Sequence, residues 1–125
     1  MMAASIARSP GGMAILNVHY AVGTILVLAS LAALFWAPAR RLVLFVLVLQ
    51  IVLGAAVWGI TKATPPALHW ILAILNGGTY ALATVFERRG QPRRTVLGVL
   101  AVGFVVFAFV YYVGMHALKV AGATV

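Results

Sequence analysis

Charged residues are scarce in this chain, and acidic residues are almost absent. Charged side chains make up 8% of the 125 residues, against about 25% in ordinary soluble domains. So few charges cannot cover the surface of a water-soluble domain of this length, and 65% of the residues are hydrophobic. The composition therefore excludes a soluble fold and predicts an integral membrane protein.

The only acidic residue is Glu87, and there is no cysteine. A proton-coupled four-helix transporter would need a carboxylate inside the membrane, and Glu87 instead stands at the end of an apolar run beside Arg88 and Arg89. A solvated ion pair is expected there, not a catalytic acid. The absence of cysteine excludes disulfides and thiolate metal sites.

Basic residues give the chain a formal net charge of +8 at pH 7. In a soluble protein this excess would suggest nucleic-acid binding. Here the Lys and Arg residues flank apolar runs, as residues that hold helices across a bilayer do. The expected partner is therefore the lipid bilayer, and no nucleic acid is expected.

Four long apolar runs divide the chain. Each has about 20 residues or more, and about 20 residues of α-helix span a hydrocarbon core of about 30 Å. The breaks between them are short, so successive helices should be antiparallel neighbours. We therefore expect one all-α domain over residues 1–125, an integral membrane antiparallel four-helix bundle with helices at about 13–36, 42–60, 66–86 and 95–118.

The basic residues divide unequally between the two ends of such a bundle. Six arginines lie at one end and three basic residues at the other: Arg40, Arg41, Arg88, Arg89, Arg93 and Arg94 against Arg8, Lys62 and Lys119. Cytoplasmic loops carry the excess of Lys and Arg, so the arginine-rich loops are predicted to be cytoplasmic. We expect a multi-pass protein of the cell membrane with both termini outside.

Three histidines converge on the end opposite the arginines. His19 lies near the start of the first run, His69 near the start of the third, and His116 near the end of the fourth. Because the helices alternate in direction, all three fall at the same membrane face. Ionisable groups in membrane helices are costly and usually functional, so we interpret the three histidines as a candidate ligand site.

The donor set admits more than one ligand. Two neutral imidazoles from facing helices suit a haem iron, whereas three could hold copper or zinc. Gly23 lies one turn after His19 and leaves room for a flat macrocycle against the backbone. Asn76 falls on the helical stripe of His69, and Gln50 adds an inward polar candidate on the second run.

Two short motifs resemble the heme A synthase family, membrane enzymes of cytochrome oxidase assembly. Residues 49–55 read LQIVLGA, and after a proline-containing hinge His69 opens an alanine-rich helix. His19 followed by Gly23 is similar to the family's other haem-ligand helix. The family is built from two related four-helix halves, and residues 19–83 of this chain resemble one half.

The resemblance implies a bis-histidine b-type haem with His19 and His69 as its axial ligands. His116 matches no motif, and its expected role is that of a neighbour of a haem propionate or a quinone, or of a replacement ligand. Three residues before the first ligand the family usually carries a glutamate, where this chain has Leu16. Enzyme activity of the heme A synthase kind is therefore left open. A homodimer would restore eight helices but not the missing acid.

One function and two alternatives follow. We expect a small membrane haem protein of the cytochrome b kind, acting in haem modification or electron transfer for the respiratory chain. The first alternative is a haem-free accessory or assembly subunit of a larger respiratory complex, since small residues such as Gly54, Ala55 and Gly59 also suit packing against a partner. The second is a copper or zinc site ligated by the histidines.

Overall fold

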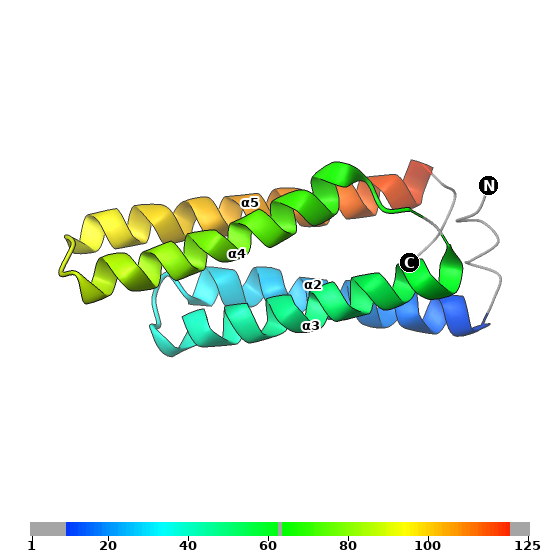
Figure 1. Cartoon of the computed structure of the whole chain (residues 1–125), viewed down its shortest axis with the longest axis horizontal. Coiled ribbons are helices and arrows are strands. Elements are labelled where there is room, and N and C mark those ends of the chain that lie inside the picture. Colours follow the sequence, from blue (N-terminus) through cyan, green and yellow to red (C-terminus); the bar gives the residue numbers. More distant parts are fainter. Residues whose placement is uncertain (1–9, 63, 121–125) are drawn as a thin grey trace.

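The structure, a computed structural model, describes residues 10–62 and 64–120, the side chains of 118–120 excepted. Four α-helices account for almost all of this part of the chain (Figure 1): α2 (Pro10–Ala32), α3 (Pro38–Thr61), α4 (Ala67–Arg88) and α5 (Arg93–Val120). No strand forms within it. The predicted all-α fold of four helices is confirmed.

The helix boundaries differ from the predicted ones chiefly at the first break. α2 already ends at Ala32, before Trp36, and α3 begins at Pro38. Proline is favoured in the first helical turn because its missing N–H would have no partner there and its φ is already helical. Arg40 and Arg41 therefore lie in the first turn of α3, and not in a loop as the sequence predicted.

The helices form two antiparallel hairpins that lie side by side (Figure 1). α2 packs with α3, α4 packs with α5, and α2 also packs along α5 and so joins the hairpins. The contact between α3 and α4 is the least extensive of the main helix contacts. The two hairpin turns lie at one end of the molecule, and the α3–α4 connection lies at the other (Figure 1).

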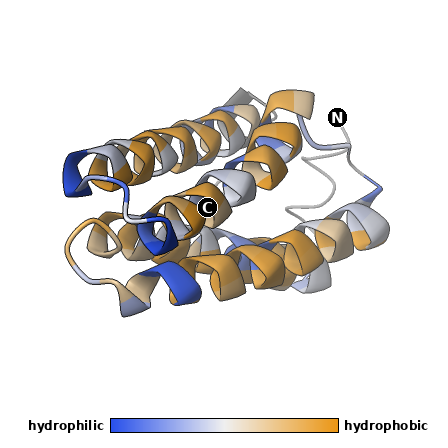
Figure 2. Ribbon diagram, turned by 60° about the vertical axis from the view of Figure 1, so that its left-hand side comes forward, coloured by the Kyte–Doolittle hydropathy of each residue, from blue (hydrophilic) through white to orange (hydrophobic). Residues whose placement is uncertain are grey.

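All four helices are long and apolar enough to cross a membrane. Their outward faces carry large apolar side chains, such as Phe45 and Val105, which are mostly exposed. Figure 2 shows hydrophobic residues along the lengths of the helices and hydrophilic residues mostly near their ends. These are the features of a multi-pass membrane protein.

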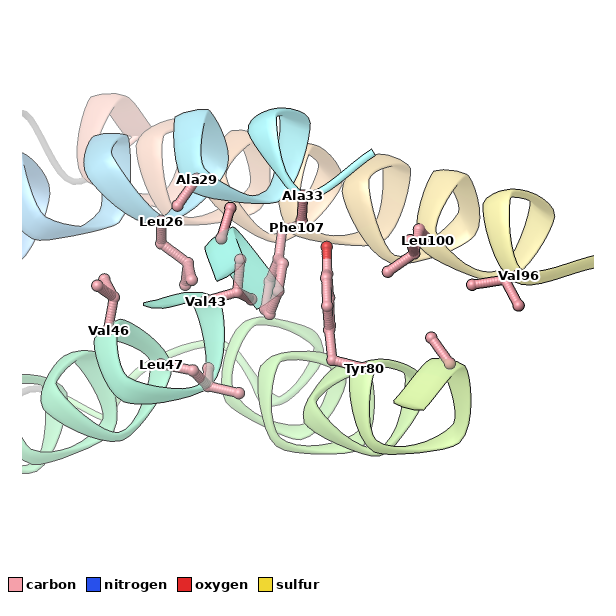
Figure 3. Close-up of a cluster of buried hydrophobic side chains, with 12 residues drawn as sticks. Leu26, Ala29, Ala33, Val43, Val46, Leu47, Tyr80, Val96, Leu100 and Phe107 are labelled. Carbon is pink, nitrogen blue, oxygen red and sulfur yellow. The ribbon is translucent and has the colours of Figure 1, made fainter. Parts of the chain in front are cut away.

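The buried core extends from the arginine end to the middle of the bundle (Figure 3). Its side chains are Leu26, Ala29, Ala33, Ala39, Val43, Val46, Leu47, Tyr80, Ala83, Val96, Leu100 and Phe107. The fully buried Tyr80 stacks on Phe107 with ring centroids 5.5 Å apart. A Cβ at Gly103 would lie 2.8 Å from the Tyr80 ring, so the absence of a side chain there lets the ring pack between α4 and α5. This core fixes the hairpins at one end and leaves the histidine end more open.

An ion pair ties the two hairpins together at the arginine end. Arg40 Nη1, near the start of α3, pairs with Oε2 of Glu87, near the end of α4. The Arg40 side chain is 15% exposed and the Glu87 side chain is 52% exposed. The only carboxylate of the sequence therefore has a basic partner on the other hairpin.

Replacing Glu87 with glutamine is expected to lower the free energy of unfolding by no more than about 1 kcal/mol, because a half-exposed ion pair is screened by water and salt. Equilibrium unfolding of the detergent-solubilised protein measures this loss. The control is Glu87→Gln in an Arg40→Gln background, where the substitution should cost little. A loss of several kcal/mol in the wild-type background would show that the pair is shielded from solvent.

Candidate ligand site between the hairpins

A cavity of about 460 Å³ lies between the two hairpins at the histidine end. Its walls come from all four helices and are largely apolar, with His19, Gln50, His69 and a few hydroxyl groups as polar members. Protein sites for small molecules and cofactors typically enclose about 300–1,000 Å³ and combine apolar walls with a few polar groups. The cavity therefore has the size and lining of such a site.

His19 and His69 face one another across this cavity. Their ring centroids are 6.1 Å apart, and the ring planes are inclined at 71°. His19 belongs to α2 and His69 to the first turn of α4, so each hairpin contributes one ring. The position of His69 follows from Pro65 and Pro66, because prolines end the preceding segment and α4 begins directly after them.

The His69 ring is held in place by α5. Its Nδ1 lies 3.0 Å from the backbone oxygen of Val110. Because a carbonyl oxygen only accepts, Nδ1 is the donor, and in the neutral ring the lone pair is on Nε2. Gly114 permits this placement, since a Cβ there would lie 2.8 Å from Cε1 of His69. A backbone carbonyl on the far ring nitrogen is the usual arrangement for a histidine that binds a metal.

His19 is positioned by Gln50 of α3. Gln50 Nε2 donates a hydrogen bond to the backbone oxygen of His19 at 2.9 Å and lies 3.5 Å from His19 Nε2. The approach depends on Gly23, where a Cβ would lie only 3.0 Å from Gln50 Nε2. Because the amide nitrogen donates, Nε2 of His19 is the acceptor in this contact and its lone pair is directed to Gln50, so a metal bound at Nε2 would replace the 3.5 Å contact and leave the bond to the backbone oxygen in place. His19 Nδ1 is buried without a hydrogen-bond partner among the described residues.

The distance between the two rings can be compared with that of two imidazoles on one metal ion. Imidazole nitrogens bind a metal such as zinc at about 2.0–2.1 Å, so two nitrogens on opposite sides of one ion lie about 4 Å apart. Each ring centroid lies about 1 Å further out, which gives a separation of about 6 Å. The observed 6.1 Å is close to this value, and it is also the separation of two rings in T-shaped contact, whose centroids lie about 4.5–7 Å apart. A haem iron with two axial imidazoles has the same donor set.

The cavity brings together four of the predicted site residues: His19, Gly23, Gln50 and His69. Asn76 and His116 do not line it. His116 is exposed and stacks on Tyr112 with ring centroids 5.9 Å apart. Among residues 10–62 and 64–120, no three His, Cys, Asp or Glu side chains are close enough together to hold a metal ion. The three histidines are therefore not gathered into one site within that part of the chain.

Sequence reasoning missed the side chains that close the cavity between α2 and α5. The hydroxyls of Tyr111 and Thr24 are 3.0 Å apart, and the rings of Tyr20 and Tyr111 have centroids 5.5 Å apart. Both tyrosines line the cavity. Tyrosines near a membrane boundary are typical of an aromatic belt, so only the packing of α2 on α5 distinguishes these two from belt residues.

Asn76 ties α4 to α5. It is 3% exposed, and its Nδ2 donates to the backbone oxygen of Gly103 at 2.8 Å. We expect Asn76→Ala to lower the free energy of unfolding by about 1 kcal/mol and to leave ligand binding unchanged. Thermal unfolding in detergent measures the loss, and Leu75→Ala, at the exposed neighbouring residue, is the control that should change little. Loss of ligand binding at unchanged stability would instead assign Asn76 to the site.

Comparison of this chain with known proteins found no match. No family model matches its sequence, and no curated protein or solved structure matches it either. The resemblance to heme A synthase therefore stays a prediction. What the cavity binds must be inferred from its donors, its spacing and its lining.

Proposed function

We propose that this chain is a small membrane haem protein in which His19 and His69 are the axial ligands of a b-type haem. The observation that carries the proposal is the facing pair of imidazoles, one from each hairpin, with ring centroids 6.1 Å apart in a largely apolar cavity. A haem of the bis-histidine kind takes two such donors in an apolar environment. Both features are present at the same place in the bundle.

The number of donors favours haem over a bare metal ion. Structural zinc sites use four protein ligands and catalytic ones three, and copper sites of the electron-transfer kind also use at least three. Only two imidazoles line this cavity. Two histidines are a complete set of protein ligands for a haem iron, because the macrocycle supplies the other four nitrogens.

The surroundings of the two rings favour electron transfer over oxidation of the haem. A haem held by both His19 and His69 would supply one-electron exchange, because with both imidazoles bound no coordination position would remain for oxygen. Val110 and Gln50 would hold the rings in place. Leu16 lines the cavity, at the position where the heme A synthase resemblance implies a glutamate. We therefore propose a role in electron transfer within a respiratory membrane.

The proposal is tested by a dithionite-reduced minus oxidised optical spectrum of the detergent-purified protein, with metal analysis of the same sample. A sharp b-type α band with about one iron per chain is expected. If the sample contains stoichiometric copper or zinc and no haem, the haem proposal is wrong and the two histidines bind a metal ion instead. Absence of both would leave the haem-free accessory subunit as the function.

The proposed orientation places the arginine end in the cytoplasm. Arg40, Arg41, Arg88, Arg89, Arg93 and Arg94 all lie at that end, and the excess of basic residues marks the cytoplasmic side. At the other end Lys62 follows α3, whereas Arg8 and the side chain of Lys119 lie outside what the structure describes. The haem would then lie near the outer face. Protease accessibility of the α4–α5 turn in right-side-out and inverted vesicles decides the orientation.

A further inference from the structure

The wall of the cavity is open to the surroundings between α3 and α4. Within the helices, five residues both line the cavity and are exposed on the outside of the bundle: Ile51, Ala55 and Trp58 on α3, with Trp70 and Ile74 on α4. We refer to these five as the α3–α4 seam. Thr64 and Pro66, in the segment between these helices, also line the cavity and are exposed. Ile51 is 40% exposed, Trp58 48% and Ile74 50%. A side chain that faces both the cavity and the exterior marks a place where the wall is one residue thick.

The packing of the helices explains why the opening lies there. α3 and α4 make the least extensive of the main helix contacts, and in sequence only the short segment after Thr61 connects them. Gly54 on α3 and Ala73 on α4, which line the cavity beside the seam, are too small to fill the gap. The opposite side of the cavity, between α2 and α5, is closed by the Tyr20–Tyr111 ring contact and the Thr24–Tyr111 hydrogen bond.

We propose that the cavity opens sideways into the hydrocarbon region of the bilayer through the α3–α4 seam, and takes up its ligand from the membrane. The ligand class is a largely apolar compound that is dissolved in the bilayer, in keeping with the apolar lining of the cavity. The seam residues belong to helices that are long and apolar enough to span the membrane, and all five are apolar or aromatic. The identity of this ligand as haem rests on the proposed function, but the opening itself does not.

Photolabelling from lipid tests the opening without any haem. The protein is reconstituted into bilayers that contain a phospholipid with a diazirine in its acyl chain, irradiated, and mapped by mass spectrometry. Phe107 and Leu100 are matched reporters on α5, because both are buried, at 2% and 0% exposure, but only Phe107 lines the cavity. We expect adducts at Phe107 and none at Leu100. Labelling of outward-facing residues alone, with Phe107 free of adducts, would overturn the lateral opening.

Uptake kinetics test the route of the ligand. Ile74→Trp adds bulk at the seam, and Leu75→Trp adds the same bulk on an exposed residue that does not line the cavity. Haemin is delivered from donor liposomes to apo protein in acceptor liposomes, and the Soret band is followed. We expect Ile74→Trp to slow uptake at least about tenfold and Leu75→Trp to leave it unchanged. Equal rates in both variants would overturn uptake through the seam.

The two experiments separate this inference from the proposed function. If the wild-type protein takes up no haemin, the proposed function fails, and the labelling of Phe107 still decides whether the cavity opens to lipid. If haemin binds but Phe107 is not labelled, the proposed function stands and the lateral opening fails.

Discussion

The His19→Ala and His69→Ala variants are expected to lose the haem, whereas His116→Ala is expected to retain it. Each of the first two removes one of the only two imidazoles that line the cavity. Loss of a group that merely orients a metal ligand costs about 10–100-fold in affinity, so loss of the ligand itself should cost at least about a hundredfold. Titration of the apo protein with haemin, followed by the dithionite-reduced spectrum, measures the change.

His116→Ala is a matched control because it removes the same chemical group from the same end of the bundle. His116 is exposed and contacts the Tyr112 ring, not the cavity. Helical circular dichroism and an unchanged elution volume establish that all three variants are folded. A wild-type spectrum in both His19→Ala and His69→Ala would show that the axial assignment is wrong. Loss of the spectrum in His116→Ala would move a ligand to α5.

The fold could be predicted because lipid imposes simple rules on the sequence. Unpaired backbone polar groups are too costly in hydrocarbon, so each apolar run of about 20 residues must be a helix. The short breaks then make successive helices antiparallel. The sequence pattern places the first break too late because Phe35 and Trp36 are as apolar as a helix interior, although they lie in and next to the α2–α3 turn. Pro38, which starts α3, was the better marker.

The placement of the histidines at the end of the bundle opposite the arginines could also be predicted, but not the direction in which each side chain points. In a soluble helix the polar face shows which side is buried, whereas here the outer face is as apolar as the inner one. His116 follows Gly114 by two residues, about 200° around the helix, so the face of α5 that contacts His69 turns His116 away. Asn76 does point inward, but about two turns deeper than His69, where it meets Gly103 instead of the cavity.

The second large effect is expected at a glycine, not at a polar residue. In Gly114→Ala the new Cβ would lie 2.8 Å from Cε1 and 3.0 Å from Nδ1 of His69. The ring must then move, although its hydrogen bond to Val110 holds it from the same face of α5. A histidine displaced in this way loses both its orientation and its hydrogen bond, so haem affinity should fall by about 10–100-fold. The haemin titration used for the histidine variants measures this loss.

Gly98→Ala is the matched control for Gly114→Ala. Both glycines lie within α5, but a Cβ at Gly98 would meet nothing within 4 Å. Alanine is favoured over glycine inside a helix by up to about 1 kcal/mol, so Gly98→Ala should bind haem normally and unfold at a slightly higher temperature. Normal binding in Gly114→Ala would show that His69 is free to shift without loss of coordination. A defect confined to Gly114→Ala would show that the position of the His69 ring depends on the absence of a side chain at residue 114. In that case α5 takes part in the site without supplying a ligand.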